Sequence, residues 1–320
     1  MKIAFKHITL LLLCCLYYQS FAQSSDDLKN KEILARNKVK NQISWDYKYT
    51  GDKPASTGIK TSVTTYTLKG DIFQVNAYNT SGQIINVEKY NYDTYGNKIE
   101  YTRNSAENSY QKKWTYNDRN LLTEESGFDG VENFRNLYAY NDKGVMTEIR
   151  YMKQNKLYEK RVFVPEGSNT RVSVYNMAGT KTSQVVLKYD ARGNLIEETV
   201  YGVNQTELEK KTYDYDDKEN LKEEAKYKLD KITQRTFYTY NSQGYLTEIA
   251  EESQSTPKFV KKSLNYDDKG NLLLIKWRRK GTEEFNTIKY MYDAKGLCSS
   301  AETNYPSTKY RVLTKYTYEF

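Results

Sequence analysis

An internal repeat of 24 to 26 residues runs through most of the sequence, and it narrows the possible folds more than any other feature. Most copies centre on an aromatic residue that is followed by Asp or Asn, and all have an apolar or aromatic residue two positions before the central one. Two such residues, separated by one position, lie on the same face of a β-strand. We call the central residues key positions: Tyr92, Tyr116, Tyr140, Tyr189, Tyr215, Tyr240, Tyr266, Tyr292 and Tyr318, with Val164 in the one gap and Leu68 at the front.

A tight-turn signature follows most key positions. The Asp or Asn directly after the aromatic residue can accept hydrogen bonds from backbone N–H groups further along the turn. A glycine three residues later supplies the left-handed backbone of a hairpin turn with a bulge. We therefore expect positive φ at these glycines, which are Gly96, Gly144, Gly193, Gly244, Gly270 and Gly296. Asn120 and Glu219 replace glycine in two of the turns, and Asn tolerates this conformation better than Glu.

Strand, tight turn, strand and looser turn therefore alternate in about ten units. This order predicts an all-β protein of about twenty antiparallel strands, each paired with its neighbours in sequence. The expected architecture is a single curved antiparallel meander, or solenoid-like sheet, that stays open or only partly curled. A short N-terminal helix would cap it, since solenoids need their end strands covered.

The turn segments YDTYGNKI, KYDARGNLI, NYDDKGNLL and MYDAKG resemble the YD repeat of the RHS family. The resemblance covers about 250 of the 320 residues. It implies a spiralling β-sheet of the kind that can close into a shell. The chain departs from that family in its longer unit, in the absence of the autocleaving end segment, and in the absence of a toxin domain.

Four segments are expected along the chain. Residues 1–22 have the charge and apolar pattern of a secretory signal peptide, so the protein should be exported to the periplasm, the cell surface or the medium. Residues 23–45 should contain the capping helix, and residues 46–62 should form an extended linker. The β-repeat domain then spans residues 63–320. After signal cleavage, no apolar segment is long enough for a transmembrane helix.

Several chemistries are excluded by residue usage. The only histidine, His7, and two of the three cysteines lie in the signal segment, which leaves Cys298. A chain without histidine has no Cys/His zinc site, no histidine acid–base group and no histidine-activated nucleophile. We therefore predict a non-enzyme with no cofactor and no metal. The net charge is +8, and the basic and acidic residues are interspersed along the sequence. Nucleic-acid binding needs clustered basic residues, so this pattern argues against nucleic acid as a partner.

Aromatic residues at the looser turns are the candidate ligand-binding residues: Tyr151, Tyr175, Tyr201, Tyr227 and Trp277. Most of the 32 tyrosines should instead form a thin core ladder. A glutamate lies eight residues after many key positions and predicts either a cross-strand ion-pair lattice or a cation track. These residues are Glu100, Glu124, Glu148, Glu197, Glu223 and Glu248. Cys298 falls in an apolar column and should be buried.

Three functions fit the sequence. The first is an exported, non-catalytic repeat scaffold that mediates protein or cell-surface interactions. The second is a carbohydrate-binding module that uses the aromatic residues of the looser turns. The third is an outer-membrane barrel, suggested by the alternating C-terminal segment that ends in Phe320. The identity of a protein or polysaccharide partner and the oligomeric state cannot be read from the sequence.

Overall fold

The computed structural model describes residues 25–320, and the expected signal peptide lies outside the described residues. One helix, α2 (Ser25–Arg36), precedes the strands. The strands are β1 (Asn41–Thr50), β2 (Lys53–Pro54), β3 (Ile59–Tyr66), β4 (Ile72–Tyr78), β5 (Ile84–Tyr92), β6 (Lys98–Ser105), β7 (Ser109–Tyr116), β8 (Leu122–Phe128), β9 (Asn133–Tyr140), β10 (Met146–Lys153), β11 (Lys156–Glu166), β12 (Asn169–Asn176), β13 (Lys181–Tyr189), β14 (Leu195–Gly202), β15 (Glu207–Tyr215), β16 (Leu221–Lys228), β17 (Lys231–Tyr240), β18 (Leu246–Ser253), β19 (Thr256–Tyr266), β20 (Leu272–Trp277), β21 (Asn286–Tyr292), β22 (Cys298–Tyr305) and β23 (Tyr310–Glu319), with a 3₁₀ turn, η1 (Pro306–Thr308), before the last.

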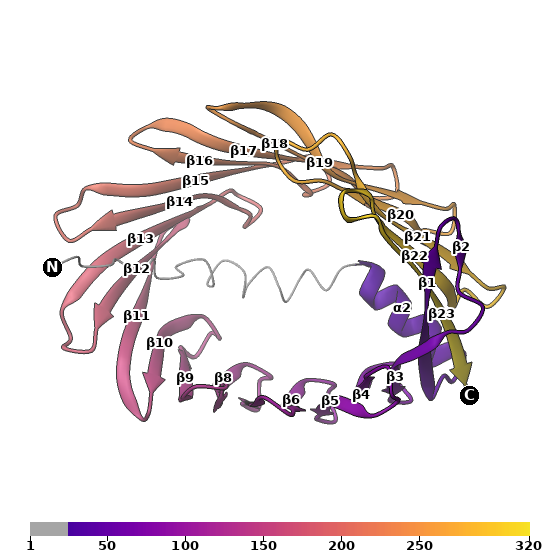
Figure 1. Ribbon diagram of the computed structural model, residues 1–320. Helices are drawn as coiled ribbons and strands as arrows, with labels where there is room; N and C mark the ends of the chain where they lie inside the picture. Colours follow the sequence, from indigo (N-terminus) through magenta and orange to yellow (C-terminus); the bar gives the residue numbers. More distant parts are fainter. Residues whose placement is uncertain (1–24) are drawn as a thin grey trace, which may run out of the picture.

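The sheet closes on itself into an antiparallel β-barrel. Strands β3 to β23 pair in sequence, as the repeat predicts, and β1 pairs with both β3 and β23. The short β2 pairs only with the end of β1, so 22 strands form the ring (Figure 1). This closure shows that the expected open meander was wrong.

The closing strand comes from the segment that we expected to be a linker. Residues 46–62 belong largely to β1 and to the start of β3, so the linker assignment is corrected. Trp45, Tyr47 and Tyr49 alternate with polar residues, which is a strand pattern without the tight-turn signature of the repeats. β1 therefore fits between the first and last repeats and satisfies the backbone groups of both exposed edges.

The two ends of the barrel carry different turns. The tight turns that follow the key positions all lie at one end, which we call the tight-turn rim. Here Asp190 is typical, because it accepts hydrogen bonds from the backbone N–H groups of Arg192 and Asn194 at 2.9 and 2.8 Å. Gly193 has a φ of 91°, and the other five glycines predicted to be left-handed have φ between 73° and 90°. Glu219 adopts the same conformation with a φ of 66°, despite its Cβ.

The other end, which we call the open-turn rim, consists of the turns between repeats. These turns include residues 105–108, 129–132, 153–156, 202–205 and 253–256.

Helix α2 packs at the tight-turn rim, beside the seam where β1 joins the first and last repeats (Figure 1). Ile33 and Leu34 of the helix form a buried cluster with Val39 and Leu297, and Tyr66 and Tyr318 pack against it. Lys31 forms an ion pair with Asp71 at 2.6 Å. A Cβ at Gly70 would lie 2.2 Å from the carbonyl oxygen of Lys31, so glycine is required for this close approach. The helix therefore occupies the capping position that the sequence predicts, over a shorter range than residues 23–45.

Candidate functional site: the tyrosine-lined inner wall

Cross-strand register assigns each side chain to one of two walls. Tyr138 lies opposite Ile149, and Ile149 lies opposite Arg161, so all three share one wall. Following the register from β9 back to β3 and β23 places Tyr66 and Tyr318 on this same wall. Because these two tyrosines pack against α2, which lies within the ring of strands in Figure 1, this is the inner wall.

One residue of the key series, Val164, does not face the inner wall. Val164 and Val162 share a wall with Glu148, which is on the outer side, while Phe163 lies opposite Val172 on the inner wall. The longer strand β11 continues through this region, with Pro165 and Glu166 still paired to β12. The repeat is thus out of phase by one residue here, and Phe163 takes the position that we assigned to Val164.

Hydrogen bonds tie the key tyrosines to the preceding unit. In seven units the tyrosine hydroxyl donates to a backbone carbonyl oxygen of the preceding unit, at 2.7–3.2 Å. The donors are Tyr92, Tyr116, Tyr140, Tyr215, Tyr240, Tyr292 and Tyr318. Burial raises the pKa of Tyr92 to about 12, so its hydroxyl stays protonated and keeps donating at neutral pH. This ladder is a structural role for the repeated tyrosine.

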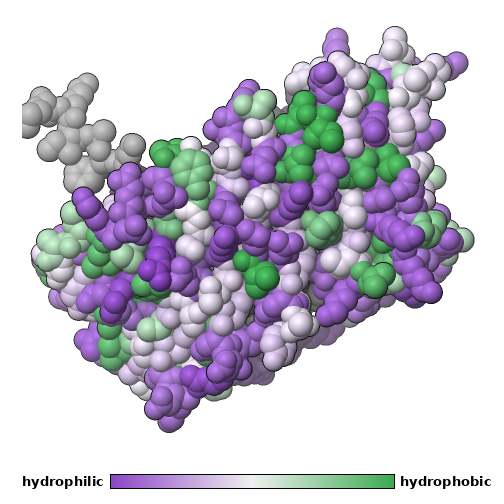
Figure 2. Space-filling model, turned by 90° about the horizontal axis from the view of Figure 1, so that it is seen from below, coloured by the Kyte–Doolittle hydropathy of each residue, from purple (hydrophilic) through white to green (hydrophobic). Residues whose placement is uncertain are grey.

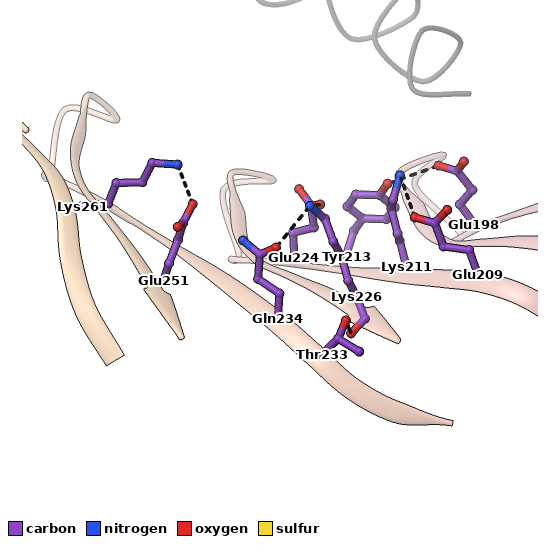
Figure 3. A network of polar contacts seen from close by, with 10 residues as sticks. All are labelled: Glu198, Glu209, Lys211, Tyr213, Glu224, Lys226, Thr233, Gln234, Glu251 and Lys261. Atoms are coloured by element: carbon purple, nitrogen blue, oxygen red, sulfur yellow. Dashed lines mark hydrogen bonds and ion pairs between the residues drawn. The ribbon is translucent and has the colours of Figure 1, made fainter. Parts of the chain in front are cut away.

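Charged groups share the inner wall with the aromatic rings. Figure 3 shows lysines and glutamates of β14 to β19 that point to the same side of the sheet. Lys261 bonds Glu251 at 2.6 Å, and the hydroxyl of Tyr213 donates to Glu198 at 3.3 Å (Figure 3). Lys211 and Glu198 are only 7% and 8% exposed. The inner wall is therefore polar, and the charged groups drawn in Figure 3 lie next to an opposite charge or a hydroxyl.

The outer wall carries the glutamate column. Five of its members form ion pairs with lysine or arginine. Four of these pairs join neighbouring strands, as the predicted cross-strand lattice requires, and they are Glu100–Lys113, Glu124–Arg135, Glu197–Lys188 and Glu223–Arg235. The fifth pair, Glu148–Arg150, lies within β10. Their N···O distances run from 2.5 to 3.8 Å. The hydrogen bond from Arg135 holds the pKa of Glu124 below its usual value. Most of the column is therefore a belt of paired charges on the outside of the barrel, at the third residue of each strand.

The five aromatic candidates do not form one site. By register, Tyr151 and Trp277 lie on the inner wall, whereas Tyr175, Tyr201 and Tyr227 lie on the outer wall. Lysines cover two of the outer rings, since Lys160 lies 5.0 Å from the centroid of Tyr175 and Lys210 lies 5.3 Å from that of Tyr227. The wall follows the residue count from the key position, because Tyr151 and Trp277 come eleven residues after theirs and face inward, whereas Tyr201 and Tyr227 come twelve residues after theirs and face outward. Tyr175 comes eleven residues after Val164 but faces outward, because that unit is out of phase by one residue.

A second glutamate column escaped notice in the sequence. Glu125, Glu198 and Glu224 each follow a glutamate of the outer column directly, and they face inward. The repeated Glu-Glu pair was the available signal, because adjacent strand residues face opposite walls.

The carboxylates of the outer column and the thiol of Cys298 each lie in a defined environment. Glu197 and Glu223 of the outer column are each paired with a different cation, Lys188 and Arg235. Burial raises the pKa of the Cys298 thiol to about 11, which keeps it protonated and a weak nucleophile at neutral pH. Among residues 25–320, no group of three or more potential metal ligands comes together.

Comparison with known proteins gives structural likenesses only. No family model matches the chain, and no curated protein matches it. A porin-like protein from Bacteroides uniformis is 12% identical, with 88% of this chain and 98% of that chain covered and a TM-score of 0.32. A porin-like protein from Bacteroides vulgatus is 10% identical, with coverages of 87% and 98% and a TM-score of 0.23. The TcdB2-TccC3 structure is 10% identical, with coverages of 88% and 24% and a TM-score of 0.17.

The closed barrel itself follows from the strand pairing of this chain. It overturns the description of the chain as an open RHS-type repeat sheet, and it agrees with the barrel architecture of the third function considered above. None of the helices in residues 25–320 has the length and hydropathy needed to cross a bilayer.

Proposed function

We propose that the protein is an exported, non-catalytic, hydrophilic β-barrel that has water on both walls and holds a polar guest against its inner wall. Twenty-two strands spaced ~4.8 Å apart and tilted to the barrel axis form a ring roughly 35–45 Å across. That width exceeds what side chains fill, since barrels of fewer strands already enclose aqueous channels. Export is supported by the signal-peptide pattern of residues 1–22.

The outer wall is the observation that carries the proposal. A barrel embedded in a bilayer needs an apolar outer band about 25 Å tall, and each Arg or Lys at the midplane costs about 2–4 kcal/mol. Here the glutamates of the column are the third residue of their strands, counted from the tight-turn rim, and Lys113, Arg150 and Arg235 are the fifth residue of theirs, so paired charges lie within the outer wall over much of the ring. In the view of Figure 2, which looks at the outside of the lower strands of Figure 1, hydrophilic residues predominate and hydrophobic ones form small separate patches. Water outside the barrel fits this surface better than lipid.

The test is the behaviour of residues 23–320 without detergent. We expect a monodisperse protein in detergent-free buffer by size-exclusion chromatography, and release from membrane fractions by alkaline carbonate. A chain that folds only in micelles and stays in the carbonate pellet would place it in the outer membrane instead.

A paired substitution sharpens this test. Glu124→Leu combined with Arg135→Leu removes one outer ion pair and adds apolar surface at the middle of the wall. A barrel surrounded by water should lose solubility, whereas a barrel surrounded by lipid should gain stability in micelles. The matched control is the pair Glu124→Gln and Arg135→Gln, which removes the charges but stays polar.

A further inference from the structure

Three tyrosines from consecutive strands form an aromatic cluster on the inner wall, in which the rings of Tyr90 and Tyr101 are tilted by 39° and those of Tyr101 and Tyr110 meet edge to face at 62°. Tyr90 of β5, Tyr101 of β6 and Tyr110 of β7 lie with ring centroids 4.9 Å apart for the first pair and 5.7 Å apart for the second. The register places Tyr101 opposite Tyr90 and Lys112, all on the inner wall. We call these three residues the tyrosine platform. None of them belongs to the five aromatic candidates from the sequence.

A cavity opens beside the platform at the open-turn rim. Its volume is about 560 Å³, within the range of roughly 300–1,000 Å³ that is typical of small-molecule sites. Its lining includes Tyr101, Arg103, Glu107, Asn108, Tyr110 and Asp129. Two flat rings thus stand next to a guanidinium, an amide and two carboxylates, so one ligand could contact an apolar face and several hydrogen-bonding groups together.

We infer that the tyrosine platform and its cavity form a binding site for the pyranose rings of an oligosaccharide. A pyranose has an apolar C–H face, which suits a tyrosine ring, and a rim of hydroxyls that both donate and accept. Arg103 supplies donors, Asp129 and Glu107 supply acceptors, and Asn108 supplies both. The inference rests on the proposed function, because it requires a lumen that is open to solutes.

The surrounding charges favour a neutral polyol over a cation. Lys98 lies 4.8 Å from the ring centroid of Tyr90, and Lys112 lies 5.9 Å from that of Tyr110. These ammonium groups lie over the first and last rings of the platform and would repel a cationic ligand there, so the central ring, Tyr101, is the one that we assign to the pyranose. Glu88 accepts a hydrogen bond from the Tyr90 hydroxyl at 2.8 Å, which fixes the end of the platform.

The experiment is isothermal titration calorimetry of the purified protein with maltohexaose, cellohexaose and N-acetylchitohexaose. We expect saturable binding of at least one of the three. Tyr101→Ala should weaken that binding at least tenfold, because it removes the central ring. Tyr101→Phe should stay within threefold of the unchanged protein, because it keeps the ring. Arg103→Leu provides a second test if Tyr101→Ala fails to fold, and it should also lose at least tenfold.

Two controls locate the binding. Tyr95→Ala removes an exposed ring at the tight-turn rim and should leave binding unchanged. Tyr305→Ala disrupts the other inner aromatic cluster at the open-turn rim, where Tyr305 packs against Trp277 with centroids 5.7 Å apart, and it should also leave binding unchanged. Absence of binding to all three sugars, or an equal loss in either control, overturns the inference. A chain that is soluble without detergent but binds no sugar contradicts only this inference, whereas a chain that requires detergent contradicts the proposed function.

Discussion

Glutamates that are adjacent in sequence face opposite walls of the barrel and have different contacts. Glu124 faces outward and pairs with Arg135 at 2.7 Å, while Glu125 faces inward, where Lys112 bonds it at 2.8 Å and the Tyr138 hydroxyl lies 3.4 Å away. Both carboxylates are paired, but the inner one also meets a buried aromatic hydroxyl. Glu197 and Glu198 repeat the contrast, with Lys188 on the outer side and Tyr213 on the inner side.

Curvature explains this difference. Side chains on the concave wall converge, whereas those on the convex wall spread apart, so the most buried charged side chains are found inside. Among the basic partners, the exposed fraction of the side chain runs from 9% for Arg161 and Lys211 to 51% for Lys261 on the inner wall. For the partners of the outer glutamate column it runs from 38% for Arg235 to 58% for Lys113. Ion pairs on the inner wall should therefore contribute more to stability than equivalent pairs on the outer wall.

Two arginines allow a matched test of this comparison. Arg161 bonds Glu159 on the inner wall at 2.6 Å, and Arg150 bonds Glu148 on the outer wall at 2.5 Å, each across the same two-residue spacing. Arg161→Ala should lower the free energy of unfolding by about 3 kcal/mol, because it leaves a shielded carboxylate without its partner. Arg150→Ala should lower it by less than about 1 kcal/mol. Urea unfolding of both variants at pH 7 measures the two losses, and equal losses would show that the walls do not differ.

Tyrosine hydroxyls provide a second and smaller contrast. On the inner wall, the Tyr240 hydroxyl donates to the carbonyl oxygen of Leu221 at 3.0 Å, so Tyr240→Phe should cost about 1 kcal/mol of unfolding free energy. On the outer wall, Tyr227→Phe keeps the ring under Lys210 and should cost close to nothing. Thermal or urea denaturation of the two variants compares them directly. A loss for Tyr227→Phe as large as that for Tyr240→Phe would show that ring packing, and not the hydrogen-bonded ladder, explains the repeated tyrosine.

Much of the local structure could be predicted from the sequence, because the same turn signature recurs in most units of the repeat. The positive φ of Gly193 and the carboxylate cap of Asp190 follow from the turn signature alone. The outer ion pairs were expected from the spacing of the glutamates, although the partners Arg135 and Arg235 were not identified in advance.

Closure and the choice of wall could not be predicted in the same way. Closure depends on β1, a single non-repeating strand whose partners lie about 20 and about 270 residues further along the chain. Wall assignment depends on bulges, and one unpaired residue inverts every side chain that follows it in the strand. This is why Phe163 faces inward in place of Val164, and why Tyr175 and Tyr151 face opposite walls.

The smallest expected effect is the pH dependence of an outer ion pair. The Arg135 hydrogen bond lowers the pKa of Glu124 in the folded state relative to the unfolded chain. A lowered carboxyl pKa adds stability above the unfolded value of about 4.3 and loses it as the pH falls through the folded value. A double-mutant cycle of Glu124→Gln and Arg135→Gln should thus give a coupling of about 0.5 kcal/mol at pH 7 that declines toward zero near pH 3. High salt should shrink the coupling at pH 7, because both side chains reach solvent. A coupling that stays constant from pH 7 to pH 3 would mean that the pair acts through packing, and the outer wall would then resemble the inner wall more than its exposure implies.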